Sequence, residues 1–120
     1  MREPTVFVRI SLPTRSRRRK IIAFVADGTS STSHTAQSVT THFPQETIVT
    51  CHAVNIDTTW TPPTGMMEAA DVLSGASTDG VALELNVAVQ LNTGASGSKT
   101  ATSAAPQRGE NATMALEPTP

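Results

Sequence analysis

The feature that most limits the fold of this chain is the alternating pattern of residues 81–91. Large apolar residues occupy every second position of this segment. Successive side chains of a strand point to opposite faces, so the pattern predicts a β-strand with one apolar face. The other face carries polar residues, which indicates an edge strand or a sheet with one side in water. The residues of this second face are Ala82, Glu84, Asn86, Ala88 and Gln90.

Three further segments predict strands. Residues 6–12 alternate in the same way, residues 21–26 are continuously apolar as in a strand covered on both faces, and residues 47–56 are rich in β-branched residues. Residues 30–43 and 64–75 place apolar residues at helical spacing, and we expect a short helix in each. From residue 21 onward, strands and helices therefore alternate, which predicts a mostly parallel sheet with right-handed crossovers.

The predicted fold class is a small α/β sandwich of two or three layers, with a mostly parallel sheet of three or four strands. This domain occupies residues 1–91 and includes an exposed basic loop at residues 14–20. Residues 92–120 consist largely of Gly, Ser, Thr, Ala, Asn and Pro. Such a segment buries too little apolar surface to offset the cost of ordering it, so we expect a flexible tail.

In a parallel sheet, ligands bind beyond the carboxyl ends of the strands, which here are three loops rich in hydroxyl groups and glycine. The first loop contains Ser30, Thr32 and Thr35. Hydroxyls, backbone amides and a helix N-terminus can jointly hold a phosphate. These residues match the hydroxyl positions of Ser/Thr-x-Thr-Gly-x-Thr, the phosphate loop of flavodoxin-like proteins, with Ser33 in place of the glycine.

The other two loops extend the resemblance to the quinone-reductase branch of the flavodoxin-like proteins. Residues 60–67 are similar to the Thr- and Pro-rich flavin loop of that branch, and residues 92–97 are similar to its Thr-Gly-rich loop. The resemblance implies a truncated, degenerate module that binds FMN for electron transfer or quinone reduction, with the redox chemistry carried by FMN and no catalytic side chain. The cofactor-binding residues that it implies are Ser30, Thr32, Thr35, Trp60, Thr61, Gly65, Thr93, Gly94 and Gly97.

A second family resemblance uses some of the same segments. Residues 27–29 and 43–44 resemble the N-terminus of the pyruvate phosphate dikinase regulatory proteins, which are nucleotide-dependent kinases and phosphorylases. The phosphate loop of those proteins ends in Lys-Thr, and residues 99–100 resemble that pair. The pattern G-x-x-x-x-G-K-T requires two glycines, however, and this chain has Thr93 and Ser98 in their places.

The alternative to a cofactor-binding module is a non-enzymatic interaction protein, viral or lineage-restricted, that uses a basic segment. Residues 1–20 carry a net charge of +6, although the whole chain carries only −1. A dense basic run binds nucleic-acid phosphates or an acidic partner, or acts as a nuclear address. The run contains no aromatic residue on which a base could stack. Its cations are Arg15, Arg17, Arg18, Arg19 and Lys20.

The remaining candidate groups predict no further site. His34 and His42 would lie ~12 Å apart along a helix, too far to share one metal ion. Cys51 has no neighbouring base or cation and is expected to be an unreactive thiol. No segment reaches the ~20 consecutive apolar residues of a membrane span, and the N-terminus is too polar for a signal peptide. We therefore expect a cytoplasmic protein, or a nuclear one if the basic run is an address, without a membrane partner.

Overall fold

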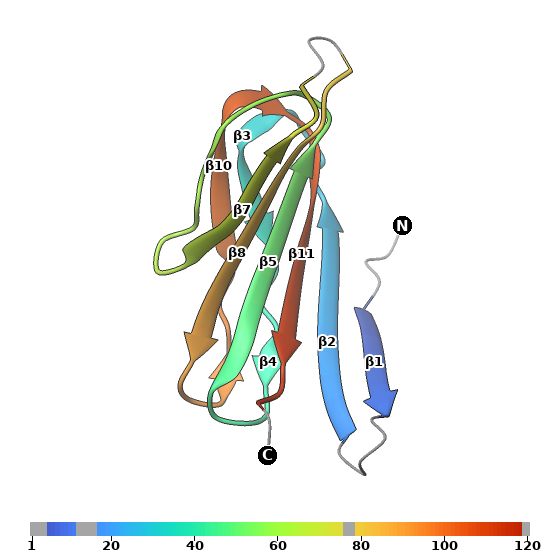
Figure 1. The fold of residues 1–120 in the computed structure, drawn as a ribbon, viewed down its shortest axis with the longest axis vertical. Helices are drawn as coiled ribbons and strands as arrows, with labels where there is room; N and C mark the ends of the chain where they lie inside the picture. Colours follow the sequence, from blue (N-terminus) through green and yellow to red (C-terminus); the bar gives the residue numbers. More distant parts are fainter. Residues whose placement is uncertain (1–4, 12–16, 76–78, 119–120) are drawn as a thin grey trace.

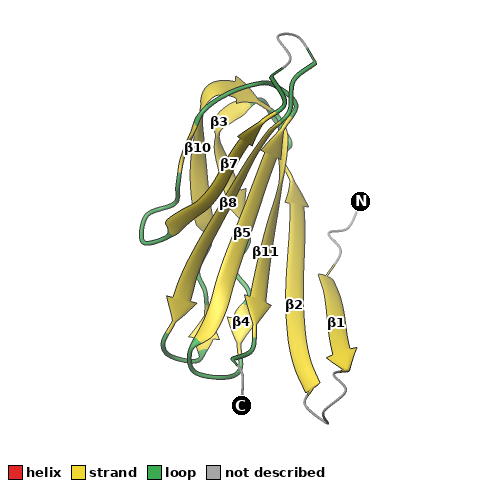
Figure 2. Cartoon of the chain, in the orientation of Figure 1, coloured by secondary structure: helices red, strands yellow, loops and turns green. Residues whose placement is uncertain are grey.

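The computed structural model describes residues 5–11, 17–75 and 79–118, with the backbone alone described for residues 5–11 and 17–20. The described chain consists of β-strands joined by loops and turns and contains no helix (Figure 2). All its strand pairs are antiparallel. The predicted α/β fold with a mostly parallel sheet is therefore wrong. The resemblance to flavodoxin-like proteins is wrong for the same reason, because their fold requires helices on both faces of a parallel sheet.

Three sheets make up the fold (Figure 1). The largest has the strand order β1-β2-β11-β5-β8-β7, the second has the order β3-β10-β6, and the third joins β4 to β9. The strands are β1 (Thr5–Ser11), β2 (Arg17–Ala26), β3 (Ser31–Ala36), β4 (Thr40–Thr41), β5 (Glu46–Val54), β6 (Trp60–Thr61), β7 (Met67–Leu73), β8 (Ala82–Gln90), β9 (Gly94–Ala95), β10 (Lys99–Gln107) and β11 (Gly109–Leu116).

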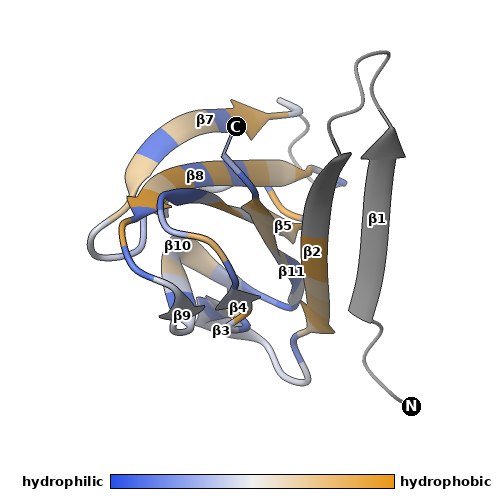
Figure 3. Ribbon diagram, turned by 90° about the horizontal axis from the view of Figure 1, so that it is seen from below, coloured by the Kyte–Doolittle hydropathy of each residue, from blue (hydrophilic) through white to orange (hydrophobic). Residues whose placement is uncertain are grey.

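The two larger sheets pack against each other as a sandwich. Strand β3 contacts β2, β5 and β11, and β10 contacts β5. Viewed from below, the smaller sheets lie on one side of the six-stranded sheet (Figure 3). We call the covered side of the six-stranded sheet its inner face, and the opposite side its outer face. No element of the described chain lies over the outer face.

Strand β8 confirms the strand predicted for residues 81–91, but its two faces are reversed. The polar side chains of Glu84 and Asn86 are fully buried on the inner face. Leu83 and Leu85 point to the outer face and are 39% and 36% exposed. The side of the strand that was expected to face water is therefore the buried one.

Strands β1, β2 and β5 agree with the strands predicted for residues 6–12, 21–26 and 47–56. Two details differ. Strand β2 begins at Arg17, so residues 17–20 belong to the sheet and not to an exposed loop; residues 14–16 lie outside the described residues. Phe24 is exposed on the outer face, so β2 is not covered on both sides.

Both predicted helices are strands. Residues 30–43 contain β3 and β4, and residues 64–75 contain β7. The ladder between β7 and β8 shifts between Glu68 and Ala70, which marks a β-bulge at Ala69. A bulge adds one residue to one strand, so neighbouring side chains on one face are three positions apart at that point instead of two. This wider spacing imitates the period of a helix.

The predicted flexible tail supplies three strands. Strand β11 lies in the middle of the large sheet, where seven of its residues pair with β2 and eight pair with β5 (Figure 1). Strand β10 is the central strand of the second sheet, and β9 pairs with β4. Backbone hydrogen bonds to two neighbours order β10 and β11 although their side chains are small.

The interior of the sandwich is largely polar. Two small apolar clusters are buried, one formed by Ile21, Ala23, Val39, Ile48 and Ala115, the other by Val54, Trp60, Ala82 and Ala101. The inner face between the sheets also buries polar side chains, which need hydrogen-bond partners to offset the loss of water. Those on the large sheet are Glu46, Thr50, His52, Glu84, Asn86, Asn111 and Thr113.

Candidate functional site

The outer face of the large sheet is apolar across five strands. The ladder registers place Phe24, Ala112, Cys51, Leu85 and Ala70 in one row across β2, β11, β5, β8 and β7. The next row is Ile22, Met114, Val49, Val87 and Met67. We call these two rows, together with Val72, Leu83 and Val89 beside them, the apolar face. Figure 3 shows strong hydrophobic colour on the described part of β2 and at the end of β7, while β10 is pale.

Much of the apolar face is open to solvent. Met67 is 72% exposed and Val89 is 59% exposed. With strands about 4.8 Å apart and about 3.3 Å per residue, the two rows, five strands wide and four residues long, cover a flat area of about 320 Å². The rows beyond them include Glu110 and Thr47. Contiguous apolar patches of this size on a soluble monomer commonly mark an interaction site. The two rows contain no charged residue, so a partner can cover them without burying an unpaired charge.

Cys51 lies near the centre of the apolar face. Its neighbours across the ladders are Ala112 and Leu85. Burial raises the pKa of the Cys51 thiol above its ordinary value of 9.0. A thiol with a raised pKa forms little of the reactive thiolate, which agrees with the prediction of an unreactive cysteine.

A Ser-His-Asp arrangement lies inside the sandwich. His34 Nδ1 is 2.6 Å from Asp27 Oδ2, and His34 Nε2 is 2.9 Å from Ser103 Oγ. These residue types form the triad of many hydrolases, in which the histidine removes the proton of an accessible serine. Ser103 is only 1% exposed, and its hydroxyl donates to the carbonyl oxygen of Ala105 at 2.8 Å. The three residues therefore join β10 and β3 to the end of β2 instead of presenting a nucleophile to substrate.

The hydrogen-bond chain continues from Asp27 across the large sheet. Asp27 Oδ1 accepts from Asn111 Nδ2 at 2.9 Å, and Asn111 Oδ1 lies 2.9 Å from His52 Nδ1. Because the amide oxygen can only accept, His52 Nδ1 carries a proton. Burial lowers the pKa of His52, although the hydrogen bond to Asn111 acts in the opposite direction. This network links polar side chains of both sheets by hydrogen bonds inside the sandwich.

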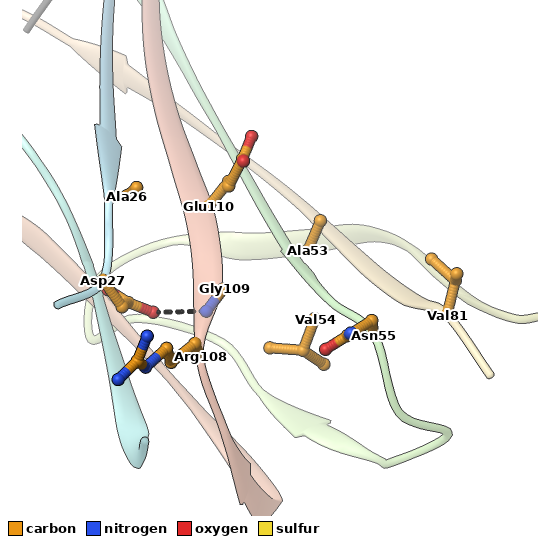
Figure 4. Close-up of a pocket in the computed structure, with 9 residues that line it drawn as sticks. All are labelled: Ala26, Asp27, Ala53, Val54, Asn55, Val81, Arg108, Gly109 and Glu110. Atoms are coloured by element: carbon orange, nitrogen blue, oxygen red, sulfur yellow. Dashed lines mark hydrogen bonds between the residues drawn. The ribbon is translucent and has the colours of Figure 1, made fainter. Parts of the chain in front are cut away.

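A hollow of about 450 Å³ opens near Asp27, at the ends of β2, β5 and β11 (Figure 4). At its side the backbone N–H of Gly109 donates to Asp27 Oδ2 at 3.1 Å. The lining residues mix small apolar with charged groups, and none is a predicted cofactor-binding residue. They are Ala26, Asp27, Ala53, Val54, Asn55, Val81, Arg108, Gly109 and Glu110.

Three carboxylates meet on the inner side of β7 and β8. Glu68, Asp71 and Glu84 each place one carboxylate oxygen within 4.8 Å of an oxygen of the other two. The pKa of Glu84 is raised to about 8, first by burial and then by Glu68 and Asp71, while Asn86 acts against this rise. Glu68 and Asp71 stand three positions apart, which places them on opposite faces of a regular strand. The sequence pattern therefore gives no signal of this cluster, which only the bulge assembles.

The structure distributes the predicted cofactor-binding residues over distant parts of the sandwich. Ser30 lies between β2 and β3, while Thr32 and Thr35 lie in β3. These positions follow the upper end of β2 in Figure 1, whereas β4, the partner of β9, lies at the lower end. Thr93 and Gly97 flank β9, and Gly94 belongs to it. The start of the first predicted loop therefore lies far from β9. Thr35, however, pairs with Thr100 of β10, and the N–H of Gly97 donates to Ser38 Oγ at 3.0 Å, so the end of the first loop lies beside the third.

The residues of the second predicted loop have structural roles. Trp60 is buried between the sheets, where its ring lies 5.3 Å from that of His34, so it offers no exposed platform for a flavin. Thr61 is exposed in β6, and Gly65 occupies a turn before β7 with a φ of 82°. In β3, the Thr35 hydroxyl is hydrogen-bonded to that of Thr100 at 2.8 Å. Flavin binding itself stays a prediction.

The predicted basic site is only partly described. Arg17, Arg18, Arg19 and Lys20 lie in β2, paired with β1, and Arg15 lies outside the described residues. Nucleic-acid or acidic-partner binding through this run stays a prediction.

Comparison with protein-family models, with curated proteins and with solved structures finds no match for this chain. The kinase-like resemblance of residues 27–29 and 43–44 is therefore wrong as well, and Lys99 and Thr100 lie in β10 instead of a phosphate loop. The described part of the chain contains no helix with the length and apolar character needed to cross a membrane. The class that the fold and surface define is an antiparallel β-sandwich with a polar interior and an apolar sheet face.

Proposed function

We propose that this chain is a non-enzymatic assembly module that pairs with a second copy of itself through the apolar face. The observation that carries the proposal is the reversed polarity of the large sheet. Its inner face buries Glu84, Asn86 and His52, while Leu85 and Val89 face outward. An isolated sheet that buries polar side chains and exposes aliphatic ones is unfavourable on both counts. Covering the outer face removes the cost of exposing the aliphatic side chains to water.

A second copy suits the apolar face in shape and in charge. Twisted sheets pack face to face about 10 Å apart with interdigitating side chains. The face lacks charged residues in its two rows, so a two-fold contact brings no like charges together. The whole chain carries a net charge of only −1, which adds little repulsion between copies. Its two rows cover about 320 Å², so a stable complex, in which each partner buries roughly 800 Å², also covers the residues around them.

Sedimentation velocity of the full chain over a range of micromolar concentrations tests the proposal. We expect a dimer that dissociates on dilution. The variant Leu85→Lys puts a charge at the centre of the face and should sediment as a monomer. The matched control is Thr102→Lys, which puts the same charge on an exposed position of β10 in the other sheet. This control should dimerise like the wild type.

Far-ultraviolet circular dichroism of the three proteins verifies that the variants remain folded. A wild type that stays monomeric throughout, or a folded Leu85→Lys variant that dimerises as well as the wild type, would overturn the proposal. Flotation with neutral phosphatidylcholine vesicles separates a lipid surface from a second copy as the occupant. Binding of monomers to these vesicles through Leu85 would assign the face to lipid instead.

A further inference from the structure

The bulge in β7 aligns two carboxylates with a buried third. Asp71 pairs with Glu84 of β8, and Glu68 pairs with Asn86. Because Ala69 is the extra residue of the bulge, Glu68 and Asp71 both point to the inner face, as Glu84 and Asn86 do. Four oxygen-bearing side chains therefore occupy two adjacent pairs of one ladder.

Glu84 has little compensation for its burial, since only Asn86 opposes the rise in its pKa. It is fully buried, and neither carboxylate oxygen has a hydrogen-bond partner among the described residues. The amide oxygen of Asn86, also fully buried, is likewise without a partner within the described chain. Buried polar oxygens are almost always paired, and a buried carboxylate beside two others is especially unfavourable. The amide nitrogen of Asn86 already donates to Thr50 Oγ1 at 3.3 Å, and ionised Glu68 and Asp71 can only accept, so the missing partner of Glu84 is a proton or a cation.

The geometry points to a calcium-binding site formed by Glu68, Asp71 and Glu84, with the side-chain oxygen of Asn86 as a further ligand. Oxygen-only ligand sets suit hard divalent cations. Calcium binds oxygen at about 2.4 Å, so two of its ligands lie at most about 4.8 Å apart. The three carboxylate oxygens meet this limit. Magnesium usually keeps several of its waters and takes only one or two carboxylates, so a set of three carboxylates favours calcium.

The position of the site at the edge of the sheet gives an ion access. Strand β7 is an edge strand, and both Glu68 and Asp71 are exposed, whereas Glu84 forms the buried floor. Calcium takes six to eight ligands, and water can fill the positions on the open side. The ion brings two positive charges to three carboxylates and so removes most of their mutual repulsion.

Thermal unfolding of the chelator-treated full chain, with calcium chloride added in steps, tests the site. We expect the melting temperature to rise and then saturate, by at least about 5 °C, because calcium binds the folded state alone. Glu84→Gln removes the buried charge without changing the shape of the side chain. This variant should melt at a higher temperature than the wild type without calcium and should no longer respond to calcium.

The control is Glu110→Gln, which makes the same change on the outer side of β11 and should keep the calcium response. Isothermal titration of the wild type with calcium should give one site per chain. An unchanged wild-type melting temperature in calcium, or an equal shift in the Glu84→Gln variant, would exclude the site. A larger shift with magnesium than with calcium at equal concentration would overturn the choice of ion. Dimerisation plays no part in these outcomes, because the ligands lie on the inner face.

Discussion

Gly109 begins β11 where the main chain of β5 is too close for a side chain. A Cβ atom at this position would overlap the carbonyl oxygen of Ala53 and lie 2.8 Å from Cγ1 of Val54. We expect Gly109→Ala to lower the free energy of unfolding by about 1–3 kcal/mol, since backbone must move to admit the methyl group. Urea unfolding followed by circular dichroism measures the change.

The control for this substitution is Gly28→Ala. A Cβ atom at Gly28 meets nothing within 4 Å, and its φ is not in the left-handed region. The change in stability should remain within about 0.5 kcal/mol. Equal stability of the Gly109 and Gly28 variants would show that β11 and β5 do not approach as closely as described.

The buried carboxylate of Glu84 predicts that calcium-free protein becomes less stable as pH rises. Its pKa is about 8 in the folded chain against an ordinary value of 4.5. The unfolded chain therefore releases this proton first, so the stabilisation is complete below pH 4.5 and is lost as pH rises through about 8. In chelator, the melting temperature of Glu84→Gln should exceed that of the wild type by a margin that grows with pH.

His52 contributes to the pH dependence in the opposite direction. Its folded-state pKa is lowered below 6.5, so its stabilisation is present above pH 6.5 and is lost as pH falls through the folded-state pKa. The wild type and Glu84→Gln share His52, so the difference between their melting temperatures isolates Glu84. A difference that is constant with pH would contradict the raised pKa.

Among the strands, β8 shows what an alternating pattern determines and what it leaves open. The pattern of residues 81–91 correctly predicted a strand and identified the members of each face. It could not determine which face is covered, because this depends on where β3 and β10 pack. The usual rule that the apolar face is buried gave the wrong answer, since the covered face of this sheet carries His52, Asn111 and Glu84.

Strands β7 and β11 were missed for different physical reasons. In β7 the bulge at Ala69 breaks the period of two, so the spacing imitated a helix and hid the acidic cluster. In β11 an alternation was present, with Asn111 and Thr113 inward and Met114 outward. The composition of residues 92–120 nevertheless predicted a flexible tail, because these residues are small and polar. The central position of β11 depends on long-range backbone pairing that local composition does not encode.

The molecule as a whole depends on its last strands. A chain ending at Leu91 lacks β9, β10 and β11, and so loses the partner that joins β2 to β5 and the centre of the second sheet. We expect this truncated chain to show no cooperative thermal unfolding. A chain ending at Pro118, which keeps every described strand, should unfold like the full protein. Cooperative unfolding of the shorter chain would mean that residues 92–120 are dispensable for the fold.

The central place of β11 also has a consequence for synthesis on the ribosome. Strands β2 and β5 emerge well before β11, yet neither can complete its pairing until β11 arrives between them. The earlier strands therefore have open edges, and their apolar side chains lie unprotected, until β11 pairs with them. Folding of this chain is completed late, and a nascent-chain chaperone has most to protect in the interval before the strand β11 leaves the exit tunnel.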